Sequence, residues 1–186
     1  MVEDYRNGIT WLSDRSEVDP QRIGVWGTSY SGGLCLYVGT HDKRVRAVVA
    51  QVPSTLNPES RRKKDPEALD RLGELLIQDR VQRYKTGSPT YMKVVAPEGE
   101  PCVLPYKDAY EWYMEFREFA PNWKNEVTIE SLEKPCEFDL VSLIHLMAPT
   151  ALLLIPGEYD NLIPIEAVKE AYERAREPKA LSAHMN

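Results

Sequence analysis

The segment GTSYSGG at residues 27–33 constrains the fold more than any other part of the sequence, because it joins two apolar runs of different kinds. The preceding run, RIGVW at 22–26, lies between turn-forming residues and is typical of a buried strand, whereas LCLYV at 34–38 is expected to be helical. A second strand is predicted at 45–51 (VRAVVAQ). Strand, helix and strand at this spacing form a βαβ unit, which predicts an α/β fold with an at least partly parallel sheet.

The rest of the chain extends this pattern. TALLLIP at 150–156 is the most apolar run and predicts a third strand, and Pro164 is suited to the start of a helix after it. We therefore expect a core formed by residues 1–53 and 148–186, interrupted by a mostly helical insertion at residues 54–147 without strands of comparable strength. Further helices are expected from apolar spacing and end signals at 2–12, 65–87 and 109–119.

Composition narrows the class of protein. The 186 residues suit one domain or two, and the 29 acidic against 23 basic residues (net charge −6) argue against a nucleic-acid binder. No apolar stretch approaches the ~20 residues that span a bilayer, so no membrane partner is expected. Cys35, Cys102 and Cys136 match neither a disulfide framework nor a metal-site spacing, which predicts a cytoplasmic protein. We expect no metal and no cofactor, and both a monomer and a homo-oligomer remain open.

Ser29 is the candidate nucleophile. A serine at a sharp strand-to-helix turn needs small neighbours, and Gly27 and Gly32 supply that room. The start of the following helix directs backbone N–H groups, including that of Tyr30, toward a developing oxyanion. Ser31 occupies the fifth position of the motif, where G-x-S-x-G has glycine. The alternative, a phosphate-binding turn, expects G-x-G-x-x-G or Gly-Lys-Ser/Thr, and neither is present.

Asp160 is the candidate acid. A serine hydrolase needs a carboxylate to orient a histidine, and Asp160 follows the strand predicted at 150–156. Glu158 is a weaker rival for this role, and an ordinary turn aspartate is the alternative interpretation of Asp160.

The histidine is the least defined residue of the expected serine, histidine and acid triad. It should follow the acid in the chain, which His41 and His145 do not. His184 has the right order but follows only the short run ALSA, so we interpret it as a mobile terminal residue.

The segment RIGVWGTSYSGG, followed by DKRVRAVV and QVP, resembles the nucleophile region of α/β-hydrolases related to dienelactone hydrolases, acetyl xylan esterases and Xaa-Pro dipeptidyl-peptidases. Within that superfamily, DAYEW (108–112), APNWKNEVT (120–128) and the run from Ala148 to Lys179 are similar to fungal polyketide transferases and hydrolases of secondary-metabolite clusters. The resemblance extends to about Leu181.

The resemblance implies a partial α/β-hydrolase sheet with a helical lid, and acyl transfer or ester or thioester hydrolysis through an acyl-serine. Ser29 matches the family nucleophile, Asp160 the acid and Tyr30 the oxyanion-hole residue, whereas His184 does not match the family histidine. Compared with these relatives the chain is expected to be truncated at both ends. Two functions follow: an enzyme acting on an ester or thioester, such as a polyketide acyl group, or an inactive hydrolase-like fragment or binding module.

Overall fold

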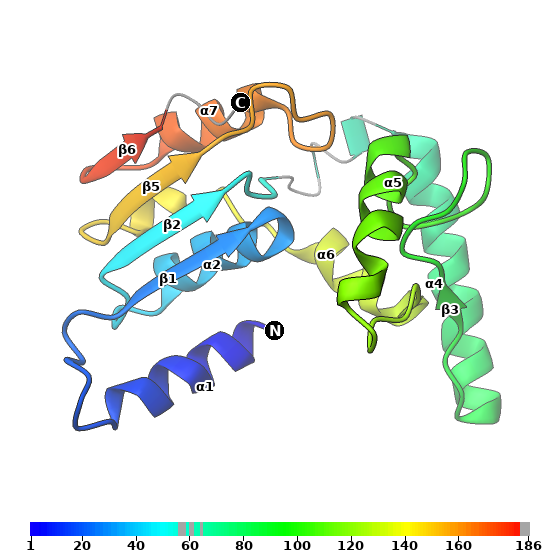
Figure 1. The fold of residues 1–186 in the computed structure, drawn as a ribbon, viewed down its shortest axis with the longest axis horizontal. Helices are drawn as coiled ribbons and strands as arrows, with labels where there is room; N and C mark the ends of the chain where they lie inside the picture. Colours follow the sequence, from blue (N-terminus) through cyan, green and yellow to red (C-terminus); the bar gives the residue numbers. More distant parts are fainter. Residues whose placement is uncertain (56–58, 60–61, 64, 183–186) are drawn as a thin grey trace. The chain divides into compact units, whose positions relative to one another are not determined.

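The computed structural model describes residues 1–55, 59, 62–63 and 65–182. The chain divides into two compact units, Met1–Ser60 with Asp139–Asn186, and Arg61–Phe138 (Figure 1). The predicted division into a core and an insertion at residues 54–147 stays a prediction. Each unit is described separately below.

The first unit is built on a four-stranded parallel sheet with the order β1-β2-β5-β6. The strands are β1 (Gly24–Thr28), β2 (Ala47–Gln51), β5 (Ala151–Ile155) and β6 (Lys179–Leu181). The helices are α1 (Val2–Ser13), α2 (Ser29–His41), the short η3 (Ile144–Leu146) and α7 (Ile165–Arg174). The predicted α/β class and parallel sheet are confirmed.

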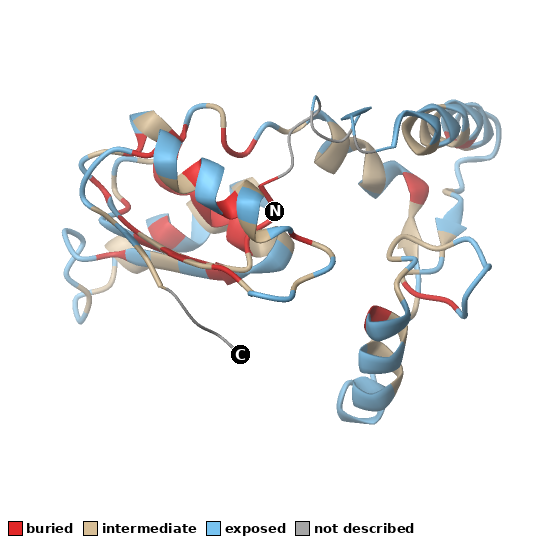
Figure 2. Cartoon of the chain, turned by 90° about the horizontal axis from the view of Figure 1, so that it is seen from above, coloured by how far each residue is buried: buried red, intermediate tan, exposed pale blue. Residues whose placement is uncertain are grey.

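One face of the sheet packs against α2. Val48 on β2 pairs in register with Leu152 on β5, and both are buried. A Cβ atom added at Gly39 of α2 would lie 2.3 Å from Val48 Cγ2, so α2 lies directly on this row of side chains. Figure 2 shows the buried residues gathered between α2 and the strands. This contact places the last turn of α2 against β2.

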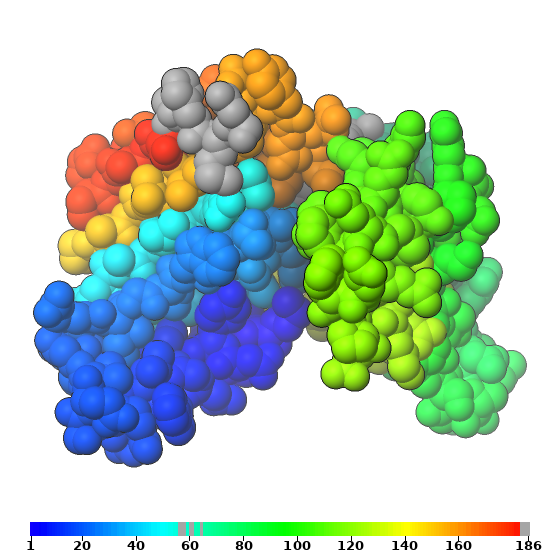
Figure 3. Space-filling model, viewed as in Figure 1, coloured from blue at the N-terminus to red at the C-terminus, as the bar shows by residue number. Residues whose placement is uncertain are grey.

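The opposite face of the sheet is more exposed. Trp26 on β1 is 60% exposed, although it lies in register with Val49 on β2. In Figure 3 the strands themselves form the surface of the first unit as adjoining bands, coloured from blue through cyan to gold. Parallel sheets generally have both faces covered, so the described residues cover only one face of this one.

Several predicted elements differ from the structure. The first strand begins at Gly24 rather than at Arg22, although Ile23 still accepts a backbone hydrogen bond from Arg46 at 2.8 Å. The run after Pro178 was expected to be barely a strand, yet β6 pairs with β5 over three residues. Three residues are too few for a period to be recognised in the sequence.

The second unit contains the long helix α4 (Pro66–Thr86) and the shorter α5 (Lys107–Phe116). The remaining elements are β3 (Tyr91–Met92), η1 (Arg117–Phe119), β4 (Val127–Thr128), η2 (Ile129–Leu132) and α6 (Glu133–Glu137). Strands β3 and β4 form an antiparallel pair of only two residues each, much shorter than β1, β2 and β5.

Helix α4 has the ends that its sequence predicts. The Asp65 side chain accepts the N–H of Ala68 at 2.8 Å, and Gly87 ends the helix at φ 72°. Val81 on this helix is 47% exposed. The deeply buried residue is Asp79, whose carboxylate accepts the N–H of Thr90 at 2.8 Å and pairs with Arg83 at 2.8 Å.

Candidate active site

Ser29 lies where β1 ends and α2 begins. Thr28, the residue before it, is extended (φ −118°, ψ 150°), whereas Ser29 has φ 54°. A positive φ is unfavourable for any residue with a Cβ atom and is maintained only where the surroundings enforce it. The Ser29 residue is exposed, so its hydroxyl is available to a ligand. This is the geometry expected of a nucleophile elbow, the strained strand-to-helix turn that presents a catalytic serine.

Two glycines allow the turn to be this tight. A Cβ atom at Gly27 would lie 2.5 Å from the carbonyl oxygen of Ser31 and 2.9 Å from Cys35 Sγ. A Cβ atom at Gly33 would lie 2.5 Å from the carbonyl oxygen of Ser54. All three distances are shorter than any ordinary contact of a Cβ atom, so glycine is required at both positions.

Ser31 explains the departure from the G-x-S-x-G pattern. Its Oγ accepts the backbone N–H of Thr28 at 3.1 Å and donates to the carbonyl oxygen of Thr28 at 2.9 Å. The serine therefore ties the first turn of α2 back to the end of β1 across the position of Ser29. Sequence reasoning treated Ser31 only as a small substitute for glycine and missed this role.

The segment after β2 connects the ends of β1 and β5. Ser54 donates its backbone N–H to the carbonyl oxygen of Ser29 at 2.9 Å, and Val52 donates to Ile155 at 2.7 Å. Val52 has φ 37°, which is a genuine outlier for a β-branched residue. Backbone hydrogen bonds therefore join the segments that follow β1, β2 and β5 at the carboxyl end of the sheet.

Asp160 follows β5, at the same carboxyl end of the sheet. Its Oδ1 atom accepts the backbone N–H groups of Leu162 at 2.8 Å and Ile163 at 2.9 Å. A Cβ atom at Gly157 would lie 3.1 Å from Asp160 Cβ and 3.3 Å from Val52 Cγ1, so the turn packs on the end of β2. Both of these hydrogen bonds are made to Oδ1, and none of the described residues donates a hydrogen bond to the second oxygen, Oδ2. Asp160 thus has a structural role in this turn.

Two of the three histidines lie far from Ser29. His41 is the last residue of α2, about 18 Å along the helix axis from Ser29, and it stacks on Tyr37 with ring centroids 4.2 Å apart. His145 lies in η3, before the start of β5, and therefore at the amino end of a strand whose carboxyl end leads to Asp160. His184 lies outside the described residues.

Tyr30 and Glu158 are the remaining candidates. Tyr30 is half-buried in the first turn of α2. Glu158 is exposed. In residues 1–55 and 65–182, no three His, Cys, Asp or Glu side chains are grouped as metal ligands would be, and no helix there is long and apolar enough to cross a bilayer.

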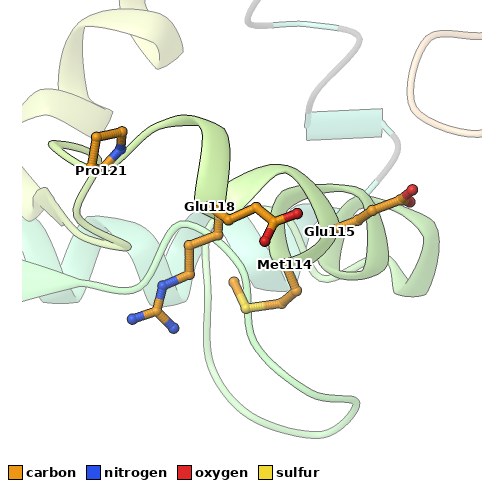
Figure 4. A pocket seen from close by; sticks show the side chains of 5 residues that line it. Met114, Glu115, Glu118 and Pro121 are labelled. Atoms are coloured by element: carbon orange, nitrogen blue, oxygen red, sulfur yellow. The ribbon is translucent and has the colours of Figure 1, made fainter.

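A hollow lies within the second unit. It has a volume of about 540 Å³ and is lined by Met114, Glu115, Arg117, Glu118 and Pro121 (Figure 4). None of these residues was expected to bind a ligand. Aromatic residues of α5 and η1 lie side by side. The ring centroids of Trp112 and Phe116 are 5.2 Å apart, and those of Phe116 and Phe119 are 6.1 Å apart. All three of these aromatic side chains remain substantially exposed.

Comparisons with known proteins show the family of the chain. Residues 1–109 match the family model described as BAAT / Acyl-CoA thioester hydrolase C terminal. The thiohydrolase aneE of Aspergillus aculeatus is 28% identical over 97% of this chain and 58% of its own length. The polyketide transferase grgF of Penicillium sp. is 26% identical over 97% of this chain and 59% of its own length. The chain thus spans less than two thirds of these relatives.

A solved structure confirms the fold. The crystal structure of the α/β hydrolase GrgF from Penicillium sp. sh18 superposes with a TM-score of 0.82 at 23% identity, covering 97% of this chain and 61% of that one. The expected relation to α/β-hydrolases and to fungal polyketide transferases is therefore confirmed.

Proposed function

The chain belongs to the BAAT / acyl-CoA thioester hydrolase C-terminal family, and from this we propose that it hydrolyses or transfers an acyl group through an ester of Ser29. The observation that supports this most strongly is the backbone of Ser29, at φ 54° between β1 and α2. An exposed serine in this strained conformation is typical of a nucleophile and has no evident structural use.

The chemistry proceeds in two steps. The Oγ atom of Ser29 attacks the acyl carbonyl carbon, its proton passes to a base, and the thiolate or alkoxide leaves with a proton. Water or an acceptor alcohol then attacks the acyl-serine, and Ser29 regains its proton. First-turn amides of α2, including that of Tyr30, would stabilise the oxyanion in both steps. Asp160 would orient a histidine through its second oxygen.

A thioester is the acyl donor that we favour. The family name and the names of the relatives, thiohydrolase and polyketide transferase, refer to thioester or acyl-transfer chemistry. We propose a polyketide acyl group as the substrate class. We also propose a reducing, cytoplasmic setting, as the number and spacing of the cysteines suggest.

The positions of the histidines favour a second candidate. Because His41 and His145 both lie away from Ser29, a hydrolase-like protein that binds an acyl group without turning it over is the alternative. Loss of one triad member typically leaves only the ~10³–10⁴-fold rate supplied by the oxyanion hole and binding. The two candidates differ in whether an acyl-serine forms.

Trapping of that intermediate tests the proposal. The chain is incubated with an acyl N-acetylcysteamine thioester, quenched in acid, digested and examined by mass spectrometry. We expect an acyl adduct on the peptide containing Ser29, absent in Ser29→Ala and present in Ser16→Ala, which removes an exposed serine from the same unit. A folded chain that forms no adduct on Ser29 would favour the binding protein over the enzyme.

A further inference from the structure

Two peptide groups flank the α carbon of Ser29, and a hydrogen bond holds each of them. The carbonyl oxygen of Thr28, in the peptide before Ser29, accepts the hydroxyl of Ser31 at 2.9 Å. The carbonyl oxygen of Ser29, in the peptide after it, accepts the backbone N–H of Ser54 at 2.9 Å. Because peptide groups are planar, the orientations of these two groups set the φ and ψ angles of Ser29. Both bonds therefore act on the backbone conformation of Ser29.

The hydroxyl of Ser31 makes a second bond to the same residue. Its oxygen accepts the backbone N–H of Thr28 at 3.1 Å, in the peptide that joins Gly27 to Thr28. A serine hydroxyl has one proton and two lone pairs, so it donates to one backbone group and accepts from the other at the same time. Thr28 is thereby held extended, at φ −118° and ψ 150°, up to the point where Ser29 turns to φ 54°. Alanine or glycine at position 31 would make neither of these bonds.

The close approach of β1 and α2 brings Ser31 within reach of Thr28. A Cβ atom at Gly27 would lie 2.6 Å from the carbonyl carbon of Ser31, so the last turn of the strand and the first turn of the helix are in direct contact. A short side chain therefore spans the distance. Since a serine side chain has little rotational freedom to lose, its hydroxyl is fixed here at a small cost in conformational entropy.

We propose that Ser31 is a positioning residue whose hydroxyl holds the Thr28–Ser29 peptide, keeps Ser29 at positive φ and thereby raises the rate at which Ser29 reacts. A positive φ is unfavourable for serine, so a bond that favours it increases the population of the reactive conformation. Glycine, which G-x-S-x-G has at this position, would remove that contribution. The inference rests on the proposed role of Ser29 as the nucleophile.

NMR on the whole chain tests the effect on the backbone without any reaction of Ser29. At positive φ the amide and α protons of a residue lie close together, which gives a strong nuclear Overhauser effect between them. We expect Ser31→Ala to weaken this effect at Ser29. It should also speed exchange of the Thr28 amide about threefold to tenfold, the factor that one hydrogen bond typically contributes, and leave the amide of Val48 unchanged. Ser31→Thr retains the hydroxyl and should resemble the unsubstituted chain in both measurements.

The rate at which a fluorophosphonate labels Ser29 gives the functional readout, measured over a range of probe concentrations. We expect Ser31→Ala and Ser31→Gly to lower the maximal labelling rate about threefold to tenfold, for the same reason, with little change in the concentration that gives half of it. Ser31→Thr should restore the rate. The control is Thr40→Val, which removes a hydroxyl of the same helix that bonds to the carbonyl oxygen of Leu36 at 2.8 Å, and it should leave labelling unchanged.

Three results would overturn the positioning role: labelling of Ser31→Ala at the unsubstituted rate, no recovery in Ser31→Thr, or an unchanged nuclear Overhauser effect at Ser29 in Ser31→Ala. If Ser29 is not labelled in the unsubstituted chain, the proposed function fails, whereas the NMR measurements still decide whether Ser31 holds the backbone. Should Ser31→Ala not fold, Ser31→Cys should show the same changes, because a thiol is a weaker hydrogen-bonding group, and their absence contradicts the proposal.

Discussion

The backbone N–H of Ser54 donates to the carbonyl oxygen of Ser29 at 2.9 Å, although 25 positions separate the two residues in the sequence. This bond fixes the start of α2 to the segment that follows β2. Gly33 lies one turn further along α2 and packs against the same residue, because its backbone approaches the carbonyl oxygen of Ser54. The conformation of Ser29 therefore depends on close contact between two separate backbone segments.

Gly33→Ala is expected to disturb this contact. The added Cβ would lie 2.5 Å from the carbonyl oxygen of Ser54 and 2.6 Å from Leu140 Cδ1, so α2 or its neighbours must move. Overpacking of this kind typically costs about 1–3 kcal/mol, and we expect that loss in the free energy of unfolding measured in urea. Gly8→Ala is the matched control, since nothing lies within 4 Å and alanine favours a helix by about 0.5–1 kcal/mol. Equal stability of the two variants would contradict the tight contact.

Substitution of Asp160 tests its structural role. Asp160→Ala removes the acceptor of two backbone N–H groups and should lower the free energy of unfolding by about 1–3 kcal/mol. Asp160→Asn retains a side-chain oxygen and should be close to the unsubstituted protein in stability. A similar loss in both variants, measured by urea denaturation, would show that the charge rather than the acceptor holds the turn.

Asp79 should make the second unit sensitive to acid. Hydrogen bonding by the backbone of Thr90, and then by Arg83, lowers the pKa of Asp79 in the folded protein. The resulting stabilisation is present above the unfolded-state pKa of about 3.9 and is lost as the pH falls through the lower folded pKa. The difference in urea midpoint between the unsubstituted protein and Asp79→Asn should therefore be large at pH 7 and shrink below about pH 4. A difference that is the same at both pH values would contradict the role of the Asp79 charge.

The histidines give a prediction about turnover. We expect slow hydrolysis of p-nitrophenyl acetate, unaffected by His41→Ala, because His41 lies at the far end of α2 from Ser29. We expect the same of His145→Ala, since η3 precedes β5. His184→Ala is also expected to have no effect. Rapid turnover that depends on both Ser29 and His184 would show that His184 completes the triad.

Much of the fold could be predicted because it is encoded locally. The strands of the βαβ unit are short apolar runs, and Asp65 and Gly87 mark the ends of α4. Strand β6 and the β3–β4 pair were missed or undervalued since two or three residues show no period. Their positions depend on the strands beside them rather than on their own residues.

The candidate site could be predicted only in part. The order of strand, serine and helix located Ser29, and a carboxylate after an apolar strand indicated Asp160. The hydrogen bonds of Ser31 and Ser54 could not be foreseen, because they depend on backbone positions that only the packed sheet defines. The positive φ of Val52 is also a consequence of packing, since its side chain opposes that conformation.

The central claim is that Ser29 is a nucleophile, and covalent labelling tests it most directly. The folded chain is incubated with a fluorophosphonate, and the modified residue is identified by peptide mass spectrometry. We expect slow but stoichiometric labelling of Ser29, abolished in Ser29→Ala and unchanged in Ser16→Ala. A folded chain in which Ser29 remains unlabelled, or in which another serine is labelled at the same rate, would contradict the account.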